Sequence, residues 1–246
     1  MSMKSIILKE KKISERITSG IFGFDNLING GFRSNTVNVI LGDTGTGKSS
    51  FSWHFIGHDD TPVIYMSLEE DLSQIRHEAL SLGLTTIEEK IKKDQLYFIA
   101  AFSDISLNST SGEIAKNFFD IELPQRLEDF KNISEKYGEL KIIIDPLTPL
   151  LFEISELKYQ RESINRIFRS LRSIGTTLVT LEKGFGEQLV KIPLFLADSV
   201  IDLDFLGLGS IYNRTLTVKK FRGSSHAEKP VPLLFEKGTG LKVLTY

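Results

Sequence analysis

The chain contains no cysteine in its 246 residues. This absence excludes disulfide bonds, thiolate metal sites and cysteine nucleophiles. Long apolar runs are missing as well, since no stretch approaches the roughly 18 consecutive apolar residues of a membrane-spanning helix. The first residues, Met1–Lys12, are polar and basic and lack the apolar centre of a secretion signal. We therefore expect a cytoplasmic protein with no membrane partner.

An excess of charge of either sign is also lacking. The chain has 30 lysines and arginines against 32 aspartates and glutamates, which leaves a formal net charge of −2. Such a balance provides no general attraction to nucleic acid or anionic lipid, so any basic surface must be local. The length is sufficient for a well-buried core, and α/β folds of about 250 residues are often single domains. We expect one domain over residues 1–246.

What the chain does have is an alternation of short apolar runs with longer segments of helical periodicity. The predicted strands are Thr36–Leu41, Val63–Ser67, Leu96–Ala101, Ile142–Ile144 and Thr177–Leu181. The predicted helices are Lys48–His58, Leu72–Leu82, Gln125–Tyr137 and Lys158–Ile174. Nearly continuous apolar strands separated by helices are typical of a parallel sheet covered by helices on both faces.

The segment after residue 198 has a different pattern. Its predicted strands follow one another with short gaps and are Ser199–Leu206, Thr215–Phe221, Val231–Phe235 and Leu241–Leu244. Closely spaced strands without helices between them indicate an antiparallel arrangement. The predicted fold class is therefore α/β, with a mostly parallel sheet, helices on both faces and an antiparallel C-terminal extension.

The sequence GDTGTGKS at Gly42–Ser49 matches the pattern GxxxxGK[ST] and lies between a predicted strand and a predicted helix. Its glycines allow successive backbone N–H groups to face one point, where the helix N-terminus adds partial positive charge. We expect Lys48 to reach the β- and γ-phosphates of a nucleotide and Ser49 to bind Mg²⁺. The expected nucleotide-binding residues are Gly42, Asp43, Thr44, Gly45, Thr46, Gly47, Lys48, Ser49 and Ser50. A glycine-rich turn that binds nothing is the alternative.

A carboxylate on a neighbouring strand would complete a magnesium site. Residues Lys141–Asp145 read as a strand that ends in an acid, and Asp145 is expected to orient a water of the Mg²⁺ shell. Pro146 follows directly, so the bland alternative is that Asp145 forms a turn. The predicted metal site consists of Ser49 and Asp145.

Two further acids, Glu69 and Glu70, follow the predicted strand Val63–Ser67. Ligands of open α/β sheets lie at the carboxyl ends of the strands, so one of these acids could polarise an attacking water. We favour Glu69 as general base with Glu70 as its support. The alternative is helix capping, in which Asp71 is the N-cap residue with Gln74 three residues later and the two glutamates favour the positive end of that helix.

Several segments, in this order along the chain, resemble the KaiC-like ATPases and the archaeal RadA paralogues of the RecA family. They are Thr18–Leu27, Gly30–Gly31, the Gly42–Ser49 loop, the Glu69–Glu70 pair and Lys220–His226. The resemblance covers nearly the whole chain, and the ordered combination is more specific than any one segment. It implies a RecA-like core that assembles into rings or filaments, with ATP held between neighbouring subunits.

In that family the paired glutamates act on the hydrolytic water. The residues at the matching positions of this chain are Glu69 and Glu70. In the same family a basic strand carries side chains to the γ-phosphate of the adjacent subunit. The matching residues of this chain are Lys220 and Arg222. Because alternate residues of a strand share a face, we expect Val218 to line up with these two side chains. From the residues alone, a solvated edge strand with protective lysines is the simpler interpretation.

The resemblance implies Mg²⁺-dependent ATP hydrolysis by a homo-oligomer that drives or regulates a partner assembly, such as the machinery of DNA recombination and repair. A scaffold or signalling module that binds nucleotide with little turnover is the alternative. Clock proteins of this family carry two such cores in tandem, whereas this chain carries one, which argues against a clock role.

Binding of nucleic acid has weak support in the sequence. RecA-like recombinases contact single strands through two loops, which here would be Pro146–Ser155 and Glu182–Lys191. Neither loop is net positive, although Phe185 could stack on a base. The helix predicted after Asp145 carries several arginines, for which a solvated helix face is the simpler explanation. They are Arg161, Arg166, Arg169 and Arg172.

Overall fold

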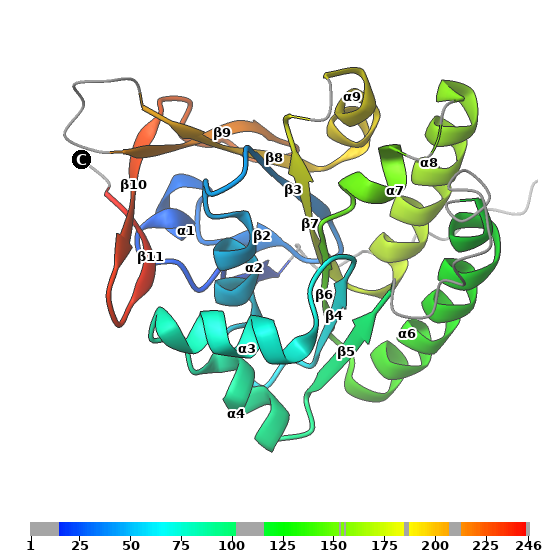
Figure 1. The fold of residues 1–246 in the computed structure, drawn as a ribbon, viewed down its shortest axis with the longest axis horizontal. Helices are drawn as coiled ribbons and strands as arrows, with labels where there is room; N and C mark the ends of the chain where they lie inside the picture. The colour runs from blue at the N-terminus through cyan, green and yellow to red at the C-terminus, as the bar shows by residue number, and fades with distance from the viewer. Residues whose placement is uncertain are drawn as a thin grey trace, which may run out of the picture.

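The computed structural model describes residues 15–101, 116–152, 154, 156–184, 187–206 and 213–244. A nine-stranded sheet forms its centre (Figure 1). The parallel strands are β3 (Val37–Gly42), β4 (Val63–Ser67), β5 (Leu96–Ala100), β6 (Lys141–Asp145), β7 (Thr176–Glu182) and β8 (Ser199–Phe205). Every residue of β3, β4 and β6 is buried, which explains why these segments read as apolar runs.

The antiparallel strands are β9 (Arg214–Phe221), β10 (Val231–Glu236) and β11 (Gly240–Val243). The order across the sheet is β11-β10-β9-β8-β3-β7-β6-β4-β5. A separate pair, β1 (Arg16–Ile17) with β2 (Phe32–Arg33), flanks the short helix α1 (Phe24–Leu27). The α/β class, the mostly parallel sheet and the antiparallel C-terminal strands are thus confirmed.

Helices cover both faces of the sheet (Figure 1). One face carries α2 (Lys48–Ile56), α3 (Leu72–Ser81) and α4 (Thr86–Lys92). The other carries the π-helical turn η1 (Phe118–Glu122) with α6 (Leu123–Tyr137), α7 (Thr148–Phe152), α8 (Leu157–Ile174) and α9 (Glu187–Leu196). Within the described ranges, none of these helices is long and apolar enough to cross a membrane.

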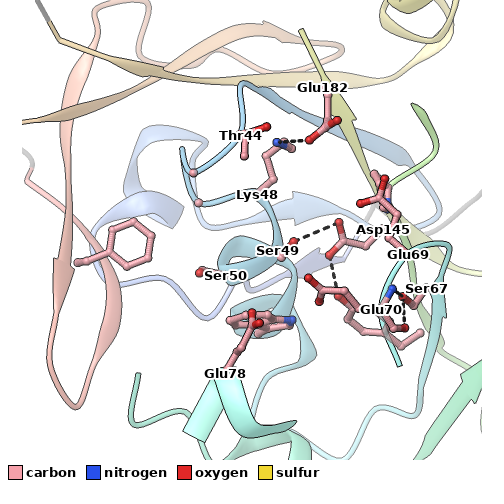
Figure 2. A pocket seen from close by; sticks show the side chains of 16 residues that line it. Thr44, Lys48, Ser49, Ser50, Ser67, Glu69, Glu70, Glu78, Asp145 and Glu182 are labelled. Atoms are coloured by element: carbon pink, nitrogen blue, oxygen red, sulfur yellow. Dashed lines mark hydrogen bonds and ion pairs between the residues drawn. The ribbon is translucent and has the colours of Figure 1, made fainter. Parts of the chain in front are cut away.

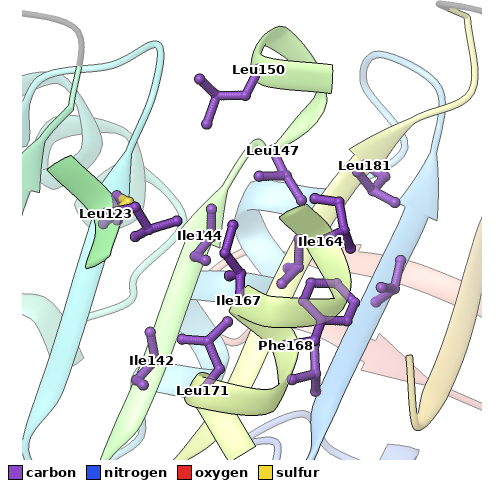
Figure 3. Packing of buried hydrophobic residues seen from close by; sticks show 14 of the residues in the cluster. Leu123, Ile142, Ile144, Leu147, Leu150, Ile164, Ile167, Phe168, Leu171 and Leu181 are labelled. Carbon is purple, nitrogen blue, oxygen red and sulfur yellow. The ribbon is translucent and has the colours of Figure 1, made fainter. Parts of the chain in front are cut away.

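Two apolar clusters hold the layers together. On the α8 face, Ile142 and Ile144 of β6 pack with Ile164, Ile167 and other side chains of α8 (Figure 3). Full burial of such a side chain contributes about 1.5–3 kcal/mol, so this face alone is strongly stabilising. The α2 face is aromatic instead, and the rings of its residues lie 5.1–6.3 Å apart. These residues are Phe24, Phe32, Phe51 and Phe55, which pin the N-terminal segment onto α2.

The prediction that Ser199–Leu206 begins the antiparallel part is wrong. Strand β8 pairs in parallel with β3, and the antiparallel part starts at β9. The crossover before β8 is α9, a helix that was not predicted from the sequence and that contains Pro193. Proline cannot donate to the carbonyl four residues earlier. Here the carbonyl of Leu189 accepts a hydrogen bond from Gln160 Nε2 at 3.3 Å, so α9 tolerates the proline.

Strand β9 contains an irregularity that overturns a second prediction. Val200 pairs with Lys220, but Ile201 pairs with Val218, so Lys219 is an extra residue in β9. Such a bulge breaks the alternation of side chains along a strand. Val218 and Phe221 join the core on the α2 face, whereas Lys220 pairs with Val200, which belongs to the core on the α8 face. Val218 and Lys220 therefore do not share a face.

Candidate functional site

The Gly42–Ser49 loop connects the end of β3 to the start of α2, as predicted. A Cβ atom at Gly42 would lie 2.4 Å from Thr46 Oγ1 and 2.9 Å from the carbonyl oxygen of Leu203. Gly47 precedes the helix with φ 111°, a left-handed conformation that favours glycine. Glycine is therefore required at positions 42 and 47, and the N–H groups of the first helical turn remain available to an anion.

Lys48 lies inside this turn and is 7% exposed. Its Nζ donates to the carbonyl oxygen of Asp43 at 3.0 Å and lies 3.4 Å from Glu182 Oε1. Glu182 ends β7 and is paired with Gly42 in the sheet. Glu182 was not predicted as a site residue, although it is an acid at the end of a strand, which is the signal that indicated Asp145.

Asp145 ends β6 beside this loop and is buried. Its Oδ1 accepts a hydrogen bond from Thr180 Oγ1 and lies 3.5 Å from Ser49 Oγ, while its Oδ2 accepts from Tyr65 at 2.6 Å. Burial raises the pKa of Asp145, and these hydroxyl donors act in the opposite direction. The predicted proximity of Ser49 and Asp145 is present.

Glu69 and Glu70 lie at the same edge of the sheet, after β4 (Figure 2). Partial burial raises the pKa of Glu69, with further contributions from the negative charges of Glu182 and Asp145. The pKa of Glu70 is raised to about 7 by burial and then by the charge of Glu78. The positive charge of Lys48 acts on Glu69 in the opposite direction and lowers its pKa.

The capping interpretation of this segment is correct in part. Asp71 is the N-cap residue of α3, and its carboxylate accepts a hydrogen bond from the backbone N–H of Gln74 at 2.9 Å. The Gln74 side chain does not return to the N-cap but lies 3.2 Å from Glu78. Capping therefore uses Asp71 and leaves the carboxylates of Glu69 and Glu70 for the site.

These residues surround a cavity of about 300 Å³ (Figure 2). Its walls are the glycine-rich loop, the acids described above, and the aromatic residues Trp53 and Phe235. Trp53 is 3% exposed and packs in the core on the α2 face while also lining the cavity. The predicted residues that line this cavity are Thr44, Gly45, Gly47, Lys48, Ser49, Ser50, Glu69, Glu70 and Asp145. Gly42, Asp43 and Thr46 belong to the loop but are not among the lining residues of the cavity.

An aromatic rim beside the loop has no counterpart in the sequence analysis. A Cβ atom at Gly47 would lie 3.0 Å from the ring of Phe235. The guanidinium of Arg214 lies over the rings of Phe205 and Phe235 and donates from Nε to the carbonyl oxygen of Gly45 at 3.0 Å. These residues come from β8, β9 and β10, whose register could not be read from the chain.

Lys220 and Arg222 do not reach this cavity within the subunit. Both lie beside the amino end of β8, whereas the loop lies beside its carboxyl end. Lys220 Nζ donates to the carbonyl oxygens of Leu194 and Phe195 at 3.0 and 2.9 Å, and Arg222 Nη2 donates to that of Phe195 at 3.0 Å. Burial and then the charge of Arg222 lower the pKa of Lys220 to about 8. In one subunit these cations stabilise the C-terminus of α9.

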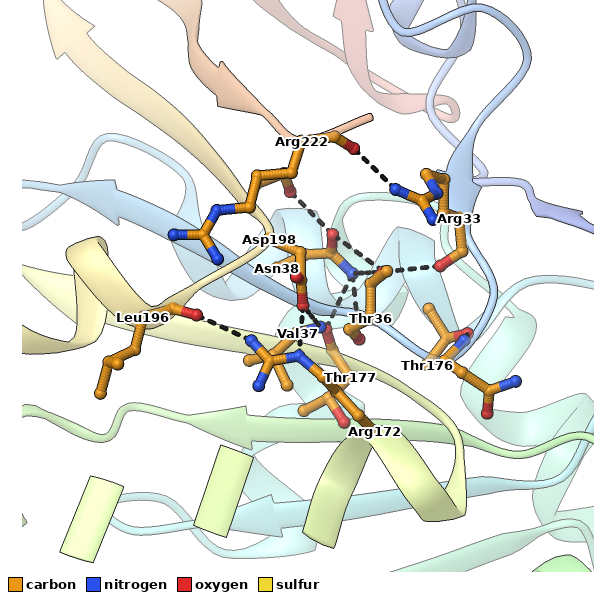
Figure 4. Close-up of polar contacts among 12 residues, drawn as sticks. Arg33, Thr36, Val37, Asn38, Arg172, Thr176, Thr177, Leu196, Asp198 and Arg222 are labelled. Atoms are coloured by element: carbon orange, nitrogen blue, oxygen red, sulfur yellow. Dashed lines mark hydrogen bonds and ion pairs between the residues drawn. The ribbon is translucent and has the colours of Figure 1, made fainter. Parts of the chain in front are cut away.

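Close to Lys220 and Arg222, a cluster of polar contacts surrounds Asp198, the residue before β8 (Figure 4). Asp198 accepts from Arg172 Nε at 2.7 Å and from the backbone N–H of Val37 at 2.9 Å. The carbonyl oxygen of Arg222 accepts from Arg33 at 2.9 Å. The arginine at position 172 is therefore a structural ion-pair partner rather than a member of a solvated face.

The two segments that correspond to the DNA-contacting loops of recombinases each contain part or all of a helix. Pro146–Ser155 contains α7, and Glu182–Lys191 contains the start of α9, while Phe185 lies outside the described residues. Of the other arginines on α8, Arg166 pairs with Asp120 at 2.7 Å and Arg161 lies over the ring of Phe195. These partners give the arginines roles that require no nucleic acid.

The donor set fits a triphosphate with magnesium. Ser49 and Asp145 offer the oxygen ligands or water contacts that Mg²⁺ prefers, and the loop offers an amine and backbone N–H groups to the phosphates. Among the described residues, no group of three or more histidine, aspartate or glutamate side chains forms a metal cage of its own. A cation held jointly by protein and phosphates is the arrangement typical of Mg²⁺.

Comparison with known proteins agrees with this geometry. The sequence model of the family described as "ATPase: KaiC" matches residues 17–246. The chain belongs to the KaiC ATPase family. It therefore carries the P-loop and the RecA-like fold that the resemblance implied.

Relatives within the KaiC family are distant in sequence. The circadian clock oscillator protein KaiC of Parasynechococcus marenigrum (strain WH8102) is 28% identical over 233 residues, which cover 92% of this chain and 44% of that protein. The circadian clock protein KaiC2 of Synechocystis sp. is 29% identical over 236 residues, or 92% of this chain and 39% of that protein. The chain thus spans less than half the length of these relatives.

A solved structure of similar size also matches. The crystal structure of a KaiC-like protein from the hyperthermophilic archaeon Pyrococcus horikoshii OT3 superimposes with a TM-score of 0.75 at 26% identity. The match covers 94% of this chain and 100% of that chain. The fold is therefore that of a KaiC-like protein over nearly the full length.

Proposed function

We propose that this KaiC-family chain hydrolyses ATP with Mg²⁺, as a homo-oligomer with the nucleotide at the interface between neighbouring copies. The observation that carries the proposal is the convergence of Lys48, Ser49, Glu69 and Asp145 on one cavity beside an anion-binding turn. Binding would begin with the phosphates displacing Glu182 from Lys48, because that contact is long, at 3.4 Å, and faces the cavity.

Each residue has a defined task in the proposed reaction. Water attacks the γ-phosphorus, the bond to the β–γ bridging oxygen breaks, and ADP and phosphate leave. Ser49 and Asp145 are the residues that would hold Mg²⁺, which would neutralise charge on the phosphate oxygens. Glu69 accepts the proton of the water, a task for which a raised carboxyl pKa is suited.

Glu70 is assigned a supporting role. Burial and the charge of Glu78 raise its pKa to about 7, so it binds a proton near neutral pH more readily than an ordinary glutamate does. A partly protonated Glu70 adds less negative charge beside the phosphates and can donate a hydrogen bond to Glu69 or to a water. It therefore tunes the base rather than replacing it.

We propose that a neighbouring copy supplies two further cations to the site, Lys220 and Arg222. Lys220 and Arg222 end in hydrogen bonds to exposed carbonyls of α9, which a γ-phosphate of an adjacent copy would replace. A cation supplied in trans accelerates phosphoryl transfer by about 10³ to 10⁵ in comparable systems. A lone subunit is therefore expected to bind nucleotide but to turn it over slowly.

The test mixes two inactive variants, Glu69→Gln and Arg222→Ala. In a mixed ring, an Arg222→Ala subunit keeps its Glu69 and obtains an intact arginine from a Glu69→Gln neighbour. If equal amounts mix at random, about one half of the subunits keep Glu69, and about one half of their neighbours keep Arg222. About a quarter of the sites are then complete, so ATP hydrolysis should recover to about a quarter of the wild-type rate. Lys219→Ala, in the same strand, is the control and should remain active, since its amine lies 3.9 Å from Asp202.

Failure of the mixture to recover, although both variants assemble with ATP and Mg²⁺, would refute the trans arrangement. Tight ATP binding with negligible turnover at every protein concentration would instead favour the nucleotide-dependent scaffold. The relatives reported above carry clock names, and none of them supports a recombination partner. Neither a clock role nor a recombination role forms part of the proposal.

A further inference from the structure

Tyr65 holds the oxygen of Asp145 that faces away from the glycine-rich loop. Its hydroxyl donates to Oδ2 at 2.6 Å, whereas Thr180 donates to Oδ1 and Ser49 lies 3.5 Å from Oδ1. The two oxygens of this carboxylate therefore have different partners. Oδ1 lies on the side of Ser49 and accepts from Thr180, while Oδ2 accepts from Tyr65.

The tyrosine is itself fixed in place. It lies in the middle of β4, paired with Ile143 of β6, and is 2% exposed. Its ring stacks on Phe98 with the centroids 5.9 Å apart and the planes 24° from parallel. A phenol held by two neighbouring strands and a stacked ring cannot follow a rotating carboxylate, so the carboxylate must conform to it.

We propose that Tyr65 is a positioning residue that fixes the rotation of the Asp145 carboxylate and keeps Oδ1 directed toward Ser49. The inference rests on the proposed magnesium site and adds the residue that orients it. Without the phenol, the other side-chain donors to Asp145 among the described residues, Thr180 and the more distant Ser49, both act on Oδ1, and the carboxylate can turn about its Cβ–Cγ bond. Loss of such an orienting partner typically weakens metal affinity by about 10–100-fold.

The test is Tyr65→Phe, which removes one hydroxyl and keeps the stacked ring. Binding of a non-hydrolysable ATP analogue to the full chain is followed by calorimetry, first in EDTA and then across a Mg²⁺ titration. The fluorescence of Trp53, which is the one tryptophan in the chain and lines the cavity, provides a second readout. We expect the half-saturating Mg²⁺ concentration to rise about tenfold, with binding in EDTA unchanged.

Tyr97→Phe is the matched control, because its hydroxyl lies 3.5 Å from Tyr137 and not at the site. It should leave both measurements at their wild-type values. An unchanged Mg²⁺ requirement in Tyr65→Phe overturns the inference, and so does an equal loss of binding with and without Mg²⁺, which would indicate a general structural role. Absence of binding by the unsubstituted chain would instead remove the proposed function, and this inference with it.

Discussion

Two buried lysines at opposite ends of the parallel sheet use their charges differently. Lys48, at the carboxyl end, has a carboxylate 3.4 Å away and borders the cavity. Lys141, at the amino end of β6, lies 2.6 Å from Asp59 and over the ring of Phe55. Packing around it is tight, since even a Cβ atom at Gly57 would lie 2.8 Å from its Nζ.

A neighbouring lysine strengthens the contrast. Lys90 of α4 is also buried, and its Nζ donates to the carbonyl oxygens of Asp59 and Thr61. Together, Lys90 and Lys141 hold the turn between α2 and β4 with their charges satisfied. A buried charge with close partners contributes to stability, whereas one with a long, replaceable partner beside a cavity is available to a ligand.

The largest effect is expected from Lys48→Ala. Loss of a cation at the developing phosphate charge should lower ATP turnover by at least about 10²–10³-fold. The melting temperature should change little, because only one carbonyl and one long ion pair lose their partner. Steady-state ATPase assays and thermal unfolding measure the two quantities. If Lys48→Ala instead unfolded but kept its turnover per folded molecule, Lys48 would have the structural role that we assign to Lys141, and the comparison would be reversed.

Lys141→Met should have the opposite profile. The apolar stem is kept, but Asp59 loses its closest cation, so the free energy of unfolding should fall by about 2 kcal/mol. For a chain of this size that corresponds to a decrease of about 6 °C in melting temperature. ATP turnover of the folded fraction should equal that of the wild type. A specific loss of turnover without loss of stability would show that the amino end also serves the site.

The raised pKa of Glu70 predicts how stability depends on pH. The folded state binds its proton up to about pH 7, while the unfolded chain releases it near its ordinary pKa. Between these values the folded state binds more protons, so stability falls as pH rises. Glu70→Gln should remove this pH dependence. Across the window it amounts to about 1 kcal/mol in the free energy of unfolding, after allowance for solvent screening.

Thermal unfolding of the wild type and Glu70→Gln between pH 5 and 8 provides the measurement. Glu78→Gln is the companion variant, because the Glu78 charge is the largest contribution to the pKa shift after burial. It should move the slope to lower pH without abolishing it. Parallel curves for the wild type and Glu70→Gln would contradict the assignment.

The smallest effect is expected at Glu182, the partner of Lys48. Glu182→Gln removes the charge that competes with phosphate, so ATP should bind about threefold more tightly in EDTA. Glu236→Gln changes the net charge equally but removes a partner of Lys242 instead, and serves as control. Equal effects in both variants would mean that general electrostatics, and not release of Lys48, sets the affinity.

Local signals made much of the site predictable from the chain. The strand Val63–Ser67, the loop at Gly42–Ser49 and the N-cap at Asp71 all depend on residues within a few positions of one another. Asp145 was found because an acid at the end of an apolar run has few roles near such a loop. These features depend on short-range backbone geometry, which the residue pattern records directly.

The remaining features depend on how distant segments align. Glu182 reaches Lys48 and Tyr65 reaches Asp145 only through the register of neighbouring strands, which periodicity does not determine. The extra residue at Lys219 and the helix around Pro193 exist because tertiary contacts compensate a local irregularity. A sequence pattern read at fixed period misses both kinds of feature.

The most direct test of the account is titration of the full chain with ATP and Mg²⁺ by calorimetry, with Lys48→Ala and Lys141→Met in parallel. The account predicts saturable binding near one nucleotide per chain, lost in Lys48→Ala and retained in folded Lys141→Met. Binding that is absent from the wild type, or that survives Lys48→Ala unchanged, would contradict the claim that the turn at Gly42–Ser49 holds the triphosphate.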